Sequence, residues 1–426
     1  MQHTANPQNF RPAPATKTIL AALTLALALT MATPAASAQT YSVLYNFTGQ
    51  SDGGNPEAGV TFDEAGNLYG TTYQGGSTNC SMYHHIGCGT VFKLSHRGAG
   101  WTFGLLHEFN GSPDGANPEA RVVFGPNGAL FGTTSEGGIG LGTVFQLQPP
   151  ATFCPTPSCP WTETQLYSFD SEYGPANPGG GDLIFDPQGN MWGTTAGGGG
   201  YLCDDGLCGG VFELSRSGGG WNEYGFNPFE GISRNPYAGL VTDDAGNFYG
   251  TTAAGPGGLY SITSSGSGGT FLLFTEQSAA FGGLLLLGNE LIGTTSQGGT
   301  GGGGTVFKYS LAGSSLTTLY NFTGPNQFGA GPTATLLMDA TGNLYGTTQI
   351  DGAHQQGSVF KLSESNGVWT LTTLHDFTGG SDGGLPFGQL TMDGSGNIYG
   401  TAQAGGNSVG NCYLNLGCGV VFEITR

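Results

Sequence analysis

Acidic, amide and aromatic residues recur in two sets of loops in this sequence. The first set includes Asp52-Gly-Gly-Asn-Pro56 and related loops that begin at Asp114 and Asp382. Carboxylate and carbonyl oxygens in such loops could bind calcium, but Asp, Gly, Asn and Pro also form ordinary turns. Because these loops lack the dense alternating acids of a calcium loop, we favour turns. We expect no cofactor, with calcium as the alternative.

The second set of loops adds aromatic side chains, which can stack on sugars while Asp and Asn bond the hydroxyls. Several of these tyrosines lie inside or beside short segments closed by cysteine pairs, which would preorganise them. Adjacent His84 and His85 could begin a metal site, but no third ligand is evident, so we expect none. The predicted binding residues are Asp52, Asn55, Tyr83, His84, Asp114, Asn117, Tyr201, Asp204, Asp382 and Tyr413.

Catalytic motifs are not evident in the sequence. No serine lies in a Gly-x-Ser-x-Gly elbow between a strand and a helix. Asp204 and Asp205 form the one conspicuous acidic pair, but residues adjacent in sequence rarely flank a scissile bond from two sides. We therefore assign no catalytic residue.

A sevenfold repeat must position these loops. Its signature is a Gly-Asn turn followed by an aromatic residue and Gly-Thr-Thr. The copies begin at Gly66, Gly128, Gly189, Gly246, Gly288, Gly342 and Gly396. Around each copy we expect four short strands, named a to d, and four antiparallel strands are the unit of a propeller blade.

The first repeat illustrates these strands. Strand a is Gly59–Asp63, strand b is the signature itself, strand c is Gly89–Leu94, and strand d is Trp101–Phe109. Asn and Gly supply the positive φ that the tight turn before strand b needs. With strand a innermost, the d-to-a and b-to-c loops share one face, which is where the predicted binding residues lie.

Two further repeated positions are predicted to be structural. Asp63 and its counterparts end strand a and are expected to bond the amides of the following turn. His107 and His375 occupy a strand d position that is tyrosine in other repeats, such as Tyr45. We therefore expect these histidines to replace the tyrosine within the blade rather than to act in catalysis.

The ends of the repeat region are permuted. The chain has a lone strand d at Tyr41–Phe47, whereas the seventh repeat stops after strand c. The first strand would complete the last blade and leave no free sheet edge. The sequence thus predicts an all-β fold, a seven-bladed β-propeller of four-stranded blades, as one domain over residues 39–426.

Residues 1–38 have the pattern of a secretory signal peptide. Arg11 and Lys17 precede an apolar run over residues 18–32, and Ala36-Ser37-Ala38 offers a cleavage site before Gln39. The run is shorter than the roughly 20 residues of a spanning helix. We expect a protein secreted to the periplasm, cell surface or medium, with no membrane insertion after cleavage.

Cysteine spacing and charge fit export. Eight cysteines form four close pairs, and disulfides persist outside the cytoplasm. The predicted pairs are Cys80–Cys88, Cys154–Cys159, Cys203–Cys208 and Cys412–Cys418. The net charge of −19 disfavours nucleic acid and anionic lipid as partners. A glycan or another exported protein stays admissible, and we expect a monomer.

The repeated units carry a family resemblance. Gly66–Thr72, the Gly-Gly that follows it and Gly89–Leu94 resemble the GloVer-type extracytoplasmic tandem repeat proteins of bacteria. The resemblance covers essentially the whole mature chain and implies secretion, but no known activity or catalytic residue.

Three functions therefore remain open. We favour a noncatalytic binding or surface-interaction propeller. The alternative is a carbohydrate-active enzyme, a glycoside hydrolase or lyase, with its site at the mouth of the central channel. Such an enzyme would need acids from several blades at nonrepeated positions. The third is a structural spacer.

Overall fold

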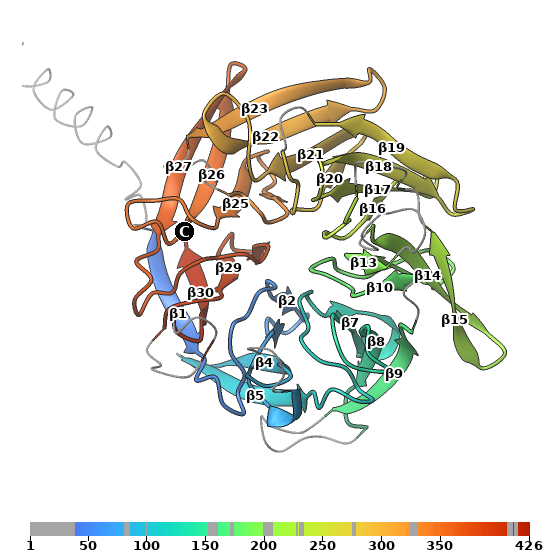
Figure 1. Ribbon diagram of the computed structural model, residues 1–426. Coiled ribbons are helices and arrows are strands. Elements are labelled where there is room, and N and C mark those ends of the chain that lie inside the picture. The colour runs from blue at the N-terminus through green and yellow to red at the C-terminus, as the bar shows by residue number, and fades with distance from the viewer. Residues whose placement is uncertain are drawn as a thin grey trace, which may run out of the picture. The chain divides into compact units, whose positions relative to one another are not determined.

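Each sequence repeat folds into one antiparallel sheet in the computed structural model. The model describes residues 39–80, 86–98, 100–151, 161–170, 174–198, 208–226, 229, 234–274, 278–323, 331–406, 412 and 416–426. In the first blade the order is β2 (Thr61–Phe62), β3 (Leu68–Thr72), β4 (Thr90–Arg97) and β5 (Gly100–Glu108). Seven such four-stranded sheets, counted over these residues, are arranged as a β-propeller (Figure 1).

The other blades repeat this order. Blades 2 to 4 consist of β6 (Val123–Phe124), β7 (Leu130–Thr134), β8 (Thr143–Gln148) and β9 (Thr162–Ser168); β11 (Ile184–Phe185), β12 (Met191–Thr195), β14 (Gly210–Ser217) and β15 (Gly220–Phe226); and β16 (Val241–Thr242), β17 (Asn247–Thr252), β18 (Gly258–Thr263) and β19 (Gly268–Leu273). Blades 5 and 6 consist of β20 (Leu285–Leu287), β21 (Glu290–Thr295), β22 (Gly302–Ser310) and β23 (Ser315–Thr323); and β24 (Leu337–Met338), β25 (Leu344–Thr348), β26 (Ser358–Ser365) and β27 (Val368–Asp376). A small extra ribbon pairs β10 (Pro175–Ala176) with β13 (Gly197–Gly198).

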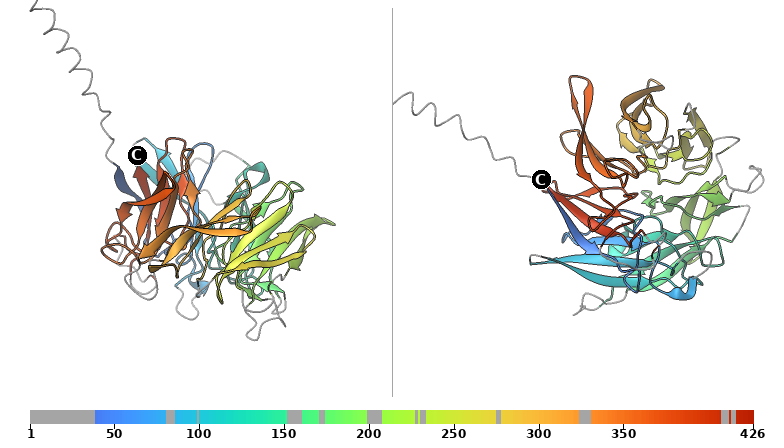
Figure 2. Two further views of the ribbon diagram at one scale, coloured as in Figure 1. Left: turned by 90° about the horizontal axis from the view of Figure 1, so that it is seen from above. Right: turned by 60° about the vertical axis from the view of Figure 1, so that its left-hand side comes forward.

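Blade 7 is built from both ends of the repeat region, as the permuted ends predict. Its strands are β28 (Thr391–Met392), β29 (Ile398–Ala402), β30 (Val420–Thr425) and the N-terminal β1 (Thr40–Asn46). β1 runs antiparallel to β30, with Thr40 opposite Thr425 and Asn46 opposite Val420. β1, drawn in blue, lies beside β30, drawn in red, in Figure 1 and in the right-hand view of Figure 2.

The hydrophobic core consists of seven clusters, each between two adjacent blades. One cluster joins Leu68 and Phe92 of blade 1 to Tyr399 and Val421 of blade 7. The strand b glycine of the signature makes this packing possible: a Cβ on Gly70 would lie 2.6 Å from the Phe92 ring. Blades are thus stabilised by burying one another's faces, and the invariant glycine makes room for the strand c phenylalanine.

The two signature threonines have separate roles. The hydroxyl of Thr71 donates to the carbonyl of Ala120 in the next blade at 3.0 Å, and Thr401 donates to Ala58 across the closure between blades 7 and 1. Thr72 instead lies 2.8 Å from the Thr90 hydroxyl within its own blade. The first threonine therefore links blades, and the second links strands b and c.

The turn between strands a and b is held by its aspartate, as predicted. Asp63 accepts hydrogen bonds from the backbone amides of Ala65 and Asn67, and also from the Tyr69 hydroxyl. Burial raises the pKa of Asp63, but these hydrogen bonds outweigh it and hold the pKa below 3.8.

The paired part of strand a is shorter than predicted, because β2 has only two residues. In the segment just before β2, the carbonyl of Ala58 accepts a hydrogen bond from Thr401 of the neighbouring blade instead of pairing within its own sheet. The same segment lines the propeller axis. Residues Thr40–Thr425 form one compact unit. In the part of the chain that the structure describes, no helix is long and apolar enough to cross a membrane.

Candidate functional site

The predicted loop aspartates hold their own loops in shape. Asp52 accepts hydrogen bonds from the backbone amide of Thr48 at 2.9 Å and from the Tyr45 hydroxyl at 3.0 Å. Asp114 and Asp382 accept the equivalent backbone bonds in their own loops. The two loop sets lie on one face, since short bridges pair d-to-a loops with b-to-c loops of the same blade.

Histidine replaces the strand d tyrosine in two of these loops. His107 Nε2 lies 3.1 Å from Asp114 Oδ2, and His375 Nε2 lies 3.2 Å from Asp382 Oδ2. Burial raises the pKa of Asp114, but the bonds from His107 and a backbone amide outweigh it and lower the pKa below 3.8. These histidines are therefore part of the blade, in agreement with the repeat alignment.

Asn55 and Asn117 fasten neighbouring blades together. The Asn55 side-chain amide donates to the carbonyl of Gln403 at 2.8 Å, and Asn117 donates to the carbonyl of Tyr73 at 2.8 Å. Both have positive φ, 52° and 56°, which asparagine tolerates. Both are buried, at 6% and 0% exposure, so these amides serve the contacts between blades.

Five of the predicted loop residues lie outside the part of the chain that the structure describes. They are Tyr83, His84, Tyr201, Asp204 and Tyr413. Their part in binding stays a prediction. Within the described residues, no group of three or more His, Cys, Asp or Glu is arranged to hold a metal ion.

Two of the predicted disulfides are confirmed. Cys80 is bonded to Cys88, and Cys412 to Cys418. Cys208 is also disulfide-bonded. Outside the described residues lie Cys154, Cys159 and Cys203.

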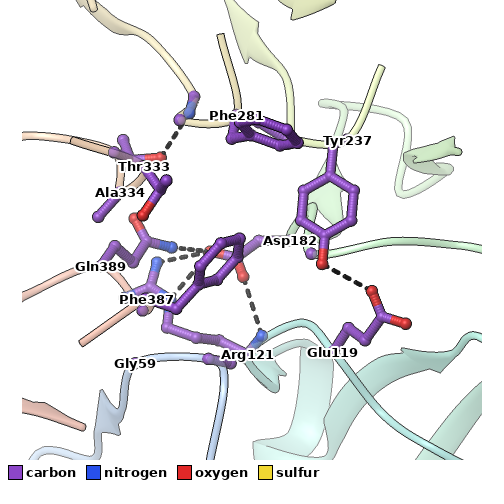
Figure 3. A pocket seen from close by; sticks show the side chains of 18 of the residues that line it. Gly59, Glu119, Arg121, Asp182, Tyr237, Phe281, Thr333, Ala334, Phe387 and Gln389 are labelled. Carbon is purple, nitrogen blue, oxygen red and sulfur yellow. Dashed lines mark hydrogen bonds and ion pairs between the residues drawn. The ribbon is translucent and has the colours of Figure 1, made fainter. Parts of the chain in front are cut away.

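Residues from all seven blades meet in a cavity of about 340 Å³ on the propeller axis (Figure 3). They come from the segment before strand a, where alternate residues face the axis. The first ring, directly after the d-to-a loops, contains Glu57, Glu119, Gly180, Tyr237, Phe281, Thr333 and Phe387. The second ring contains Gly59, Arg121, Asp182, Gly239, Gly283, Thr335 and Gln389. Unlike the signature glycine, neither ring position keeps one residue type in all seven blades.

Two carboxyl groups and a phenol dominate one side of the first ring. The Tyr237 hydroxyl donates to Glu119 Oε2 at 2.7 Å (Figure 3). Burial, reinforced by the Glu119 charge, raises the pKa of Glu57 from 4.5 to about 8. Burial also raises the pKa of Glu119, although the bond from Tyr237 opposes this. Glu57 therefore keeps its proton near neutral pH and can donate a hydrogen bond into the cavity.

Aromatic rings form the other side. Tyr237 meets Phe281 and Phe387 edge to face, with ring centroids 5.8 and 6.0 Å apart. Tyr237 has room because blade 3 has a glycine here: a Cβ on Gly180 would lie 2.7 Å from its ring. Thr333 is 6% exposed, and its hydroxyl has no hydrogen-bond partner among the described residues.

An ion pair crosses the second ring. Arg121 donates to Asp182 Oδ2 from Nε at 2.9 Å and from Nη2 at 2.6 Å, and its backbone amide donates to Oδ1 at 3.1 Å. The side-chain amide of Gln389 bonds the same carboxylate from blade 7 (Figure 3). We name Arg121, Asp182 and Gln389 the crossbar. It joins three blades and neutralises the Asp182 charge.

Sequence reasoning pointed to the channel mouth only as an alternative and named none of these residues. The repeated features, Asp-Gly and Asn-Pro, drew attention to the loops, but repetition marks blade architecture. The signal was present in the repeat itself. Glu57, Glu119 and Tyr237 each follow an Asn-Pro pair. They occupy one aligned position of the repeat at which the residue type varies, whereas a structural position such as the signature glycine keeps one residue type.

The solved structures to which this chain is similar are distant from it in sequence. No curated protein matches the sequence. A Bacteroides uniformis crystal structure, provisionally assigned as a 6-phosphogluconolactonase, is similar at 17% identity and a TM-score of 0.47, over 75% of this chain and 84% of that one. A Lactobacillus plantarum protein is similar at 12% identity and a TM-score of 0.48, over 79% and 89%.

The repeats themselves match a described family. The sequence model of the Gloeobacter/Verrucomicrobia repeat matches residues 30–157, 81–281 and 253–426, which together span nearly the whole chain. The chain therefore belongs to the Gloeobacter/Verrucomicrobia repeat family.

Proposed function

We propose that this protein is an exported, noncatalytic propeller that binds an uncharged saccharide in the axial cavity. The observation that carries the proposal is the first ring. There Glu57, Glu119 and Tyr237 meet aromatic and hydroxyl side chains from other blades, at positions that the repeat does not constrain. Residues that blade architecture does not require are free to serve a ligand.

The chemistry of the ring suits a sugar. The ring faces and edges of Tyr237, Phe281 and Phe387 offer apolar contact to C–H groups of a pyranose. Glu119 accepts hydrogen bonds, while protonated Glu57 donates one. A cavity of about 340 Å³ lies in the usual size range of small-ligand sites.

Export is part of the proposal. The predicted signal peptide, the two confirmed disulfides and the predicted extracytoplasmic family type support a location outside the cytoplasm. In that location the accessible partners would be glycans or other exported proteins. The formal net charge of −19 for the full chain favours neutral or cationic ligands over anionic ones.

Calorimetry and thermal melting with a panel of neutral oligosaccharides test the proposal. A ligand at a hundred times its dissociation constant should raise stability by about 2.7 kcal/mol. Phe387→Ala should weaken binding by about tenfold, since it removes a buried stacking face. Tyr224→Ala, on the exposed outer strand of blade 3, is the control and should bind as the wild type does. Equal loss in both variants, or no binding by the wild type, would contradict the proposal.

A second candidate function is glycoside cleavage, and the two carboxyl groups favour it. Glu57 retains a proton that could pass to a leaving group, and Glu119 is oriented by Tyr237. Release of reducing ends from any bound oligosaccharide, lost in both Glu57→Gln and Glu119→Gln, would establish it. Binding without release would leave the binding function alone.

A further inference from the structure

Strand c places a lysine over the strand b tyrosine in some blades. In blade 1 Lys93 Nζ lies 5.0 Å from the centre of the Tyr69 ring and 3.8 Å from Asp63 Oδ2. In blade 6 Lys361 Nζ lies 5.8 Å from the centre of the Tyr345 ring. The lysine ammonium group thus lies over the tyrosine ring. In blade 1 it also neutralises the Asp63 carboxylate, to which the Tyr69 hydroxyl donates a hydrogen bond.

Blade 7 replaces that lysine with a glutamate. Glu423 is opposite Tyr399 in the register, as Lys93 is opposite Tyr69. The Tyr399 hydroxyl lies 2.8 Å from Glu423 Oε1 and 3.2 Å from Asp393 Oδ2, and its single proton can serve only one of them. No lysine or arginine of the described residues forms an ion pair with either carboxylate.

A cavity of about 580 Å³ opens beside these carboxylates, between blades 7 and 1. It lies at the a-to-b turns, away from the d-to-a loops. Trp101 lines it, with its ring centre 6.1 Å from that of Tyr399, and so do Phe62 and His96. Asp63, which Lys93 pairs, and the exposed Glu64 line it from blade 1. The carboxylates of Glu423 and Asp393 beside an indole and a phenol form the environment that a cation prefers.

We propose that this cavity binds the primary ammonium group of an external ligand, seated between Glu423 and Asp393 against Trp101. The ligand takes the place of the internal lysine of blades 1 and 6. Blade 3 also has a glutamate at this position, Glu213, but there the strand b residue is Trp192, which is stacked on two phenylalanine rings.

Two kinds of molecule carry such a group on a short neutral body: an amino sugar and a lysine side chain. Calorimetry of the protein with a glucosamine tetramer and with Nα-acetyl-lysine amide, whose side-chain ammonium group is free, distinguishes them. We expect one or both amines to bind, and the amine that binds identifies the source. The N-acetylglucosamine tetramer lacks the charge and should not compete for the site. Failure of both amines to bind would overturn the proposal.

Substitutions locate the binding. Glu423→Lys would supply the internal cation again and should weaken amine binding by at least about tenfold, through loss of both ion-pair and cation–π attraction. Asp244→Lys makes the same charge change at an exposed turn of blade 4 and should bind as the wild type does.

The folded state of each variant is checked by its melting curve, and Glu423→Gln replaces Glu423→Lys if the latter does not fold. An amine affinity that survives the substitution of Glu423, or that falls equally in Asp244→Lys, would refute the proposal. Because the axial cavity is tested by neutral sugars, either proposal can fail without the other.

Discussion

Individual residues on the axis differ from their repeat counterparts in charge and environment. Glu57 and Glu119 are brought together by the ring although they come from different blades, and burial penalises their ionisation. The Asp182 carboxylate of the crossbar, by contrast, is charged and accepts hydrogen bonds from Arg121 and Gln389. The same axis therefore holds one carboxyl group that keeps its proton and one carboxylate that an arginine neutralises.

Glu57 should make stability depend on pH. Its pKa is raised on folding from 4.5 to about 8, so its contribution to stability is fully present below pH 4.5 and is lost as pH rises through about 8. Glu57→Gln cannot ionise, and its melting temperature should fall less than that of the wild type over this range. Glu64→Gln, at an exposed turn, serves as control. If the melting temperatures of wild type and Glu57→Gln fell in parallel with rising pH, folding would not raise the pKa of Glu57.

Breaking the crossbar should be costly. Arg121→Ala leaves the Asp182 carboxylate partly buried without its cation, and we expect a loss of about 3 kcal/mol in the free energy of unfolding. Lys308→Ala removes a more exposed pair with Glu290 and should cost less than about 1 kcal/mol. Urea denaturation measures both. Similar losses would mean that the crossbar is no stronger than a surface ion pair.

At the scale of the strand, each blade depends on its neighbours. Seven core clusters lie between blades, and the first threonine of the signature bonds the next blade in five of the seven contacts. In the other two, Thr133 and Thr347 have hydroxyls with no partner among the described residues.

The threonines offer a matched pair of substitutions. Thr71→Val removes a buried hydrogen bond of 3.0 Å and should cost about 1 kcal/mol, plus the penalty of an unpaired carbonyl. Thr133→Val removes a buried hydroxyl that bonds nothing, and should be neutral or stabilising. Chemical denaturation compares them directly. An equal effect in both would assign the role of the threonine to packing.

Across the whole propeller, closure depends on β1. Tyr41 of β1 stacks on His375 of blade 6, with the two ring centroids 3.6 Å apart. The N-terminal strand thus contributes both the outer edge of blade 7 and part of its packing against blade 6.

Removal of residues 39–47 should leave β30 as an unpaired edge. We expect the melting temperature to fall and the protein to self-associate, because exposed edges template pairing with other chains. Size-exclusion chromatography and melting curves measure both effects. Ser42→Ala, which keeps the strand and its backbone pairing, should remain like the wild type. A truncated protein that melts and elutes normally would show that three-stranded closure suffices.

The blades could be predicted from the residue order, because their requirements are local and repeat seven times. A Gly-Asn turn, a signature repeated seven times and a permuted first strand are all visible in the residue order, and Cys80 lies close to Cys88 in sequence. These features predicted the propeller, its closure and the two confirmed disulfides.

The grouping of the axial residues could not be predicted from the residue order, because it depends on how the ring closes. Glu57, Glu119 and Tyr237 are far apart in sequence, and closing the ring brings them to one axis. The replacement of lysine by Glu423 can be read from the aligned repeats, but the short distances from the Tyr399 hydroxyl to Glu423 and Asp393 cannot. Such sites arise from differences between repeats, and their meaning depends on distances that residue order does not specify.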